Sequence, residues 1–274
     1  MKKILALLLA LLLLALPLVS CSDDGEEEGE NNTITPVAGT EDYYKPDANK
    51  NDQFAYERIN GDEAQIVGFS GDVTPHAVSI PAEIRIKSEE SEEDIVLPVV
   101  KIAKEAFRSK TNITAITVPA GITEIDDYAF EGCTALATVV LPDTLVKIGE
   151  LAFAQSGITT ITVPATVTEL GLAAFYGCEA LRTAVLPNGI TALPNQLFMG
   201  CKVLDNVTWS NALVSIGAHA FHGCSALANV TFPQTLTSVG DYAFANCSTA
   251  LTARPGAGVT LGKNVFYPVE YEED

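Results

Sequence analysis

The chain has 274 residues, of which 47% are hydrophobic, 7% aromatic and 19% charged. Its 20 glycines and 14 prolines are too few for a collagen or a low-complexity chain. Acidic residues outnumber basic ones by 35 to 16, and the formal net charge is −19. This balance argues against binding to nucleic acids or anionic membranes, because both carry phosphate charge that would repel the chain.

The acidic residues are concentrated near the ends of the chain. Residues 22–63 contain 13 of them, whereas the much longer stretch 106–266 contains 10 acidic and 7 basic residues. The net charge of that stretch is therefore only about −3.

The first twenty residues have the pattern of a secretory signal peptide. Basic residues at positions 2 and 3 precede an apolar run from Ile4 to Val19 that contains Pro17. A transmembrane anchor is the alternative, but the run is about sixteen residues long, and about twenty are needed to span a bilayer. We predict a signal peptide over residues 1–20.

The end of this segment, Leu18-Val19-Ser20-Cys21, resembles a bacterial lipobox. The resemblance implies cleavage before Cys21 and attachment of diacylglycerol to its sulfur, with plain secretion as the alternative. Two or three acyl chains bury enough CH₂ groups to hold a protein at a membrane. The implied location is the bacterial outer membrane, with Cys21 as the lipid anchor.

Residues 21–51 are acidic and polar, and such a composition predicts a disordered tether. The acidic run Asp23–Glu30, directly after the lipidated Cys, resembles the export signal of surface-exposed bacterial lipoproteins. That resemblance implies outward exposure, and a periplasmic orientation is the alternative.

Phenylalanines recur at intervals of 22 or 23 residues through the rest of the chain, at positions 107, 130, 153, 175, 198, 221, 244 and 266. A fixed period in this range indicates a solenoid of stacked repeats. In one unit, Leu136, Val139 and Leu141 predict a short strand with three side chains facing a core. Pro142 ends that strand because proline has no N–H for a ladder. Phe153 then fills the interior of the coil.

The motif V-x-x-P-x-x-[VIL]-x-x-I-G-x-x-A-F-x-G-C recurs from about residue 99 to residue 266 and resembles the BspA-like class of leucine-rich repeats. The resemblance implies an α/β leucine-rich-repeat solenoid that is β-dominated, with about seven coils of 22–23 residues. We assign residues 52–98 to an N-terminal β cap and residues 99–274 to the solenoid with its C-terminal cap. A loop rich in Ser and Glu, 87–94, interrupts the cap.

Five cysteines occupy one position of the repeat: Cys133, Cys178, Cys201, Cys224 and Cys247. Such a column predicts small, buried and reduced side chains, since zinc needs ligands that converge from different directions. His219 and His222 lie beside Cys224, but other units vary freely at both positions. We therefore expect both histidines at the surface and no metal site.

The sequence contains no catalytic motif, and we expect no enzymatic activity and no cofactor. Glu124, Asp126 and Asp127 form a charge cluster, which we interpret as a solvated turn.

The outward positions of six predicted adjacent strands form the candidate binding surface, on the expected concave side and about 25 Å long. Arg182 and Asp205 are its only charges, and Trp209 sits at an inward, core position. The candidate partner-binding residues are Thr160, Thr162, Arg182, Thr183, Asp205, Asn206, Thr208, Asn229 and Thr231.

The family resemblance implies adhesion to extracellular or host proteins. We expect the chain to be a monomeric, non-catalytic surface lipoprotein. An accessory lipoprotein that captures nutrients or glycans for an outer-membrane system is the alternative, and a passive spacer is a third possibility. The candidate surface has no aromatic side chain. This favours a protein partner over a glycan.

Overall fold

The structure is a computed structural model that describes residues 43–44, 53–70, 76–87, 94–251 and 254–267. The predicted signal peptide, Cys21, most of the predicted tether and the centre of the 87–94 loop lie outside the described residues. Within the tether range, β1 (Tyr43–Tyr44) pairs antiparallel with β2 (Phe54–Ile59). No helix among the described residues could cross a membrane.

The strands that precede the repeat continue directly into it. β2 and β3 (Glu63–Phe69) form an antiparallel hairpin, and Asn60 and Gly61 at its turn both have positive φ. The first half of β6 (Asp94–Ile102) pairs antiparallel with β5 (Glu83–Lys87), and its second half pairs parallel with β3. The predicted boundary at residue 98 therefore falls inside β6.

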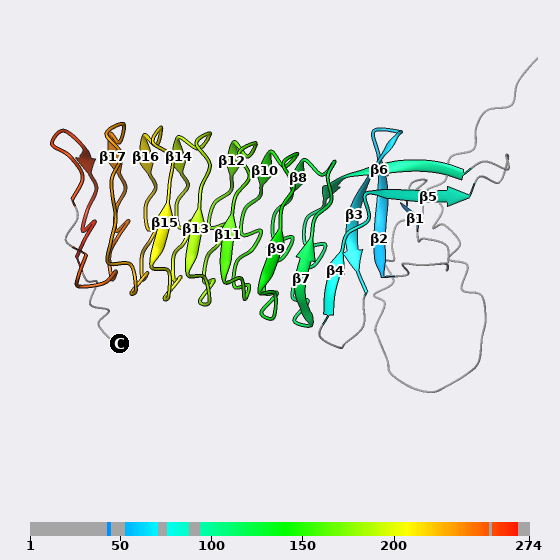
Figure 1. The fold of residues 1–274 in the computed structure, drawn as a ribbon, viewed down its shortest axis with the longest axis horizontal. Helices are drawn as coiled ribbons and strands as arrows, with labels where there is room; N and C mark the ends of the chain where they lie inside the picture. The colour runs from blue at the N-terminus through cyan, green and yellow to red at the C-terminus, as the bar shows by residue number, and fades with distance from the viewer. Residues whose placement is uncertain (1–42, 45–52, 71–75, 88–93, 252–253, 268–274) are drawn as a thin grey trace, which may run out of the picture. The chain divides into compact units, whose positions relative to one another are not determined.

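The repeat contains two rows of short parallel strands. Each row extends along the stack of coils, and its strands come from successive coils (Figure 1). One row contains β8 (Glu124–Ile125), β10 (Lys147–Ile148), β12 (Glu169–Leu170), β14 (Ala192–Leu193), β16 (Ser215–Ile216), β17 (Ser238–Val239) and β18 (Thr260–Leu261). The other row contains β4 (His76–Ser79), β7 (Ile113–Thr117), β9 (Thr138–Val140), β11 (Thr160–Thr162), β13 (Thr183–Val185) and β15 (Asn206–Thr208). The predicted β-dominated solenoid is confirmed, and the described residues contain no helix.

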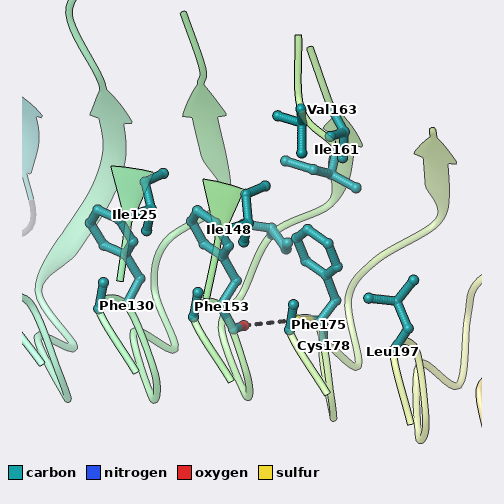
Figure 2. Close-up of a cluster of buried hydrophobic side chains, with 14 of the residues drawn as sticks. Ile125, Phe130, Ile148, Phe153, Ile161, Val163, Phe175, Cys178 and Leu197 are labelled. Atoms are coloured by element: carbon teal, nitrogen blue, oxygen red, sulfur yellow. Dashed lines mark hydrogen bonds between the residues drawn. The ribbon is translucent and has the colours of Figure 1, made fainter. Parts of the chain in front are cut away.

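The eight repeat phenylalanines form one continuous stack inside the coils. Neighbouring ring centroids are 4.9 to 5.6 Å apart from Phe107 to Phe266. Figure 2 shows Phe130, Phe153 and Phe175 at equivalent places in successive coils. All the rings except Phe266 are buried, as the sequence period predicts. One coil cannot bury such a side chain alone, so each coil is stabilised by its neighbours.

A third ladder of hydrogen bonds runs through the turns that carry these rings. The backbone N–H groups of Tyr128, Phe130 and Gly132 donate to carbonyl oxygens of the next coil at 2.8, 2.7 and 2.8 Å. The same three bonds recur at most interfaces between coils. The turns therefore satisfy their backbone groups without forming helices.

The row that contains the candidate surface is interrupted twice. Between β9 and β11 the coil is one residue short, and a Cβ on Gly157 would lie 2.2 Å from the carbonyl oxygen of Thr134. After β15, the indole N–H of Trp209 donates to the carbonyl oxygen of Thr231 at 2.8 Å, and residues 229–231 form no strand. In the preceding coil, the backbone N–H of Leu186 makes the equivalent bond.

The expectation of six adjacent strands was therefore wrong. The candidate surface consists of β7 and β9 in one sheet, β11, β13 and β15 in another, and an irregular sixth segment.

Candidate functional site

The nine candidate residues lie together on one side of four consecutive coils, and we call this surface the Thr face. Eight of them are exposed and Thr183 is half-buried, whereas the intervening Ile161 and Ala184 are buried. Strand pairing places Thr160, Thr183 and Asn206 in one line across the coils. It places Thr162, Val185 and Thr208 in a second, parallel line. The members of the Thr face are Thr160, Thr162, Arg182, Thr183, Asp205, Asn206, Thr208, Asn229 and Thr231.

Arg182 and Asp205 occupy the same position in successive coils. The backbone N–H of Asp205 donates to the carbonyl oxygen of Arg182 at 3.2 Å. Both side chains are exposed, and neither forms an ion pair with another described residue. By contrast, Lys202 and Glu179, also in these two coils, form an ion pair at 2.7 Å. The two charges of the Thr face are therefore available to a partner.

Trp209 lies at the edge of this face and packs inward, as predicted. Its ring stacks on Phe232 with the centroids 6.0 Å apart and meets Phe221 edge-on at 5.7 Å. It is half-buried and contacts the core. The ring is thus part of the interior and supplies no flat aromatic platform on the Thr face.

The cysteines form the predicted column of free thiols, of which four are buried and Cys247 is half-buried. Each thiol donates to the carbonyl oxygen of a phenylalanine in the preceding coil, and Figure 2 shows this bond from Cys178 to Phe153, with 3.0 Å between Sγ and O. Burial raises the pKa of the Cys133 and Cys247 thiols to about 12. These thiols are therefore protonated packing groups and poor nucleophiles.

The expectation that both histidines lie at the surface was wrong for His222, which is only 7% exposed. Its Nε2 is 3.5 Å from the side-chain nitrogen of Asn246, and its ring centroid is 5.6 Å from that of His219. Burial, with a smaller contribution from His219, lowers the pKa of His222. His219 stacks on Tyr242 at 5.1 Å. The described residues contain no group of three side chains suited to a metal ion.

The interpretation of the acidic cluster as a solvated turn was also wrong. Glu124 forms ion pairs with Lys101 of the preceding coil at 3.2 Å and with Lys147 of the next coil at 2.6 Å. Asp126 also pairs with Lys101, at 2.8 Å. Burial raises the pKa of Asp126, but the hydrogen bond and charge of Lys101 outweigh it, and the net pKa is lowered. These carboxylates connect coils and are not arranged as an acid–base pair.

A further polar position, which sequence reasoning missed, caps the turns of three coils. At this position a side-chain oxygen accepts a hydrogen bond from a backbone N–H group of the following coil. Asp127 accepts from Glu150 at 2.8 Å, Asn195 from Ala218 at 2.8 Å and Asp241 from Lys263 at 2.7 Å. The recurrence of Asp and Asn at this position was visible in the sequence. Its meaning depended on the contact between coils.

Two kinds of comparison relate this chain to known proteins. The family model described as "BspA type Leucine rich repeat region" matches residues 100–209 and 191–271, with six copies. No curated protein sequence matches the chain significantly.

Two solved structures share the fold. A leucine-rich-repeat protein from Bacteroides ovatus is 27% identical, with a TM-score of 0.58. The alignment covers 78% of this chain and 61% of that protein, so this chain matches less than two thirds of that relative's length. The leucine-rich-repeat protein of T. pallidum is 26% identical, with a TM-score of 0.64 and coverage of 73% of this chain and 88% of its own.

Proposed function

Because this chain belongs to the BspA-type leucine-rich-repeat family, we propose that it is a non-catalytic binding module on the bacterial cell surface. A lipid on Cys21 anchors it to the outer membrane, and residues 21–51 act as a tether that holds the solenoid away from the lipid. The Thr face binds an extracellular or host protein.

The observation that carries the binding role is the availability of Arg182 and Asp205. Both are exposed, whereas Lys202 and Glu179 in the same two coils pair with each other, and the residues beside the two charges on the Thr face are small and uncharged. Exposed arginines are over-represented among residues that dominate protein interfaces. Strands on a continuous core also hold these side chains in place, which reduces the entropy lost on binding.

The non-catalytic part of the proposal rests on how the described reactive groups are used. The thiols donate to phenylalanine carbonyls, Glu124 and Asp126 bind lysines of other coils, and His222 is buried. Each contact holds neighbouring coils together. These side chains therefore serve to hold the coils together, and we assign them no catalytic role.

A binding experiment with the purified chain tests the proposal. We expect retention of at least one extracellular-matrix protein by immobilised chain, and loss of that retention in Arg182→Glu. Lys263→Glu makes the same change of charge at an exposed position outside the Thr face and should bind as the unmodified chain does. Retention of glycans alone on a parallel glycan array would instead support the nutrient-capture function.

A further inference from the structure

The two charges of the Thr face are arranged so that the face is complementary to itself. Arg182 and Asp205 hold the same position in successive coils, next to β13 and β15. A two-fold axis that lies parallel to these strands and passes between them would place Arg182 of one copy opposite Asp205 of the other. Symmetry would then form the reciprocal pair as well. We propose that the Thr face binds the Thr face of a second copy of this chain.

This inference rests on the proposed function and names the partner as an identical chain, so that adhesion is homophilic. It does not require the chain to be a stable dimer in dilute solution.

The side chains beside the two charges suit close packing of one sheet on another. Thr162, Val185 and Thr208 form a line of small β-branched residues across three in-register parallel strands. Two facing sheets pack about 10 Å apart, and small β-branched side chains suit that spacing because they fit a pleated surface. The face contains no proline or glycine that would interrupt this packing.

The same axis pairs compatible groups farther out. It places β11 opposite residues 229–231 of the second copy, so that the hydroxyls of Thr160 and Thr162 oppose the polar side chains of Asn229 and Thr231. No like charges meet. Most acidic residues lie outside residues 106–266, whose net charge is about −3, and repulsion between two solenoids is correspondingly small.

The size of the contact predicts a weak and reversible interaction. Four coils spaced by about 4.8 Å extend for roughly 20 Å along the stack. Such a patch lies at the low end of specific interfaces. Many anchored copies on facing surfaces would still hold together, because the effective concentration after the first contact is high.

Sedimentation equilibrium of the purified chain tests the inference. We expect reversible self-association that Arg182→Glu and Asp205→Arg each weaken by about tenfold or more, because each change creates two like-charge contacts across the axis. A mixture of the two variants should associate again, because Glu at position 182 then meets Arg at position 205, and Arg182 meets Asp205. Restoration in the mixture also shows that both variants are folded.

Lys263→Glu is the control and should associate like the unmodified chain. The inference is overturned if the unmodified chain remains monomeric up to about 1 mM, if the single variants associate normally, or if the mixture fails to associate. Binding of a matrix protein that persists without self-association would leave the proposed function standing and remove only its homophilic form.

Discussion

Cys178 donates its thiol hydrogen to the carbonyl oxygen of Phe153 in the preceding coil, with 3.0 Å between Sγ and O. The same oxygen also accepts the backbone N–H of Ser156 at 3.2 Å. Equivalent thiol bonds join Cys133 to Phe107 and Cys224 to Phe198. The side chain that lines the core thus also connects the backbones of adjacent coils.

The burial of these thiols predicts slow alkylation of the folded chain. With pKa values of about 12 for Cys133 and Cys247, very little thiolate exists at pH 8. We expect iodoacetamide to modify the half-buried Cys247 slowly and the buried thiols only after addition of denaturant, as measured by mass spectrometry. Rapid modification of Cys133 in the folded chain would contradict this assignment.

The raised thiol pKa values also predict a loss of stability at alkaline pH. Above about pH 9 the unfolded thiol ionises while the folded Cys133 thiol stays protonated up to about pH 12. The unfolded state then binds fewer protons, so stability falls by about 1.4 kcal/mol per pH unit for each such thiol. Urea unfolding from pH 8 to pH 10.5 should show a shallower decline in Cys133→Ala than in the unmodified chain. Equal slopes would show that Cys133 does not contribute.

His222 predicts a loss of stability at acidic pH. Its folded pKa lies below the ordinary value of 6.5, so the folded state disfavours protonation. The associated stability is fully present above about pH 6.5 and is lost as the pH falls below it. His222→Met, which introduces the residue found at the equivalent Met199, should reduce the fall in Tm between pH 7.5 and pH 5. His219→Gln is the comparison, and an unchanged fall in His222→Met would refute the role of His222.

Gly149 permits close approach of two coils. A Cβ at this position would lie 2.6 Å from backbone atoms of Asp126 and Asp127 in the preceding coil. Gly149→Ala should therefore destabilise the chain by about 1–3 kcal/mol in urea unfolding, because the backbone must shift. A Cβ on Gly256 would meet no atom within 4 Å, so Gly256→Ala should be close to neutral. Similar stabilities for the two variants would contradict this explanation.

Gln155 offers a stabilising substitution. It has a φ of 55°, and the equivalent residue is glycine in four other coils, Gly132, Gly177, Gly200 and Gly223. A left-handed conformation costs a non-glycine residue roughly 1–2 kcal/mol, and the extra entropy of unfolded glycine offsets part of the gain. Gln155→Gly should raise stability by about 0.5–1 kcal/mol. The matched change Ala154→Gly, at a buried neighbour without positive φ, should lower it.

The lipid anchor is tested separately from the solenoid. Incorporation of labelled palmitate should disappear in Cys21→Ala, because the Cys sulfur is the proposed attachment site. Persistence of the label would refute the anchor. Protease added to intact cells should remove the solenoid if it faces outward, and protection would place it in the periplasm.

Much of the fold was predictable because the interior of a solenoid repeats. A single period explains the phenylalanine stack, the thiol column and the strands that begin most of the coils. Prediction failed where neighbouring coils differ. The indole of Trp209 takes the place of a backbone donor of the strand row, an effect that does not follow from the period. The burial of His222 likewise depends on Asn246 in the next coil.

The spacing of the core residues, the class of solenoid and the residues that point away from the core could all be read from the repeat, because side chains that recur in phase must share one environment. The stacking of the coils had to be known before one could say which charged side chains form ion pairs between coils and which do not. Glu124 and Asp126 are neutralised by lysines from other coils, whereas Arg182 and Asp205 are adjacent and unpaired. Ion pairing depends on the distance between side chains that are one turn of the solenoid apart, and that distance is set only when the coils stack.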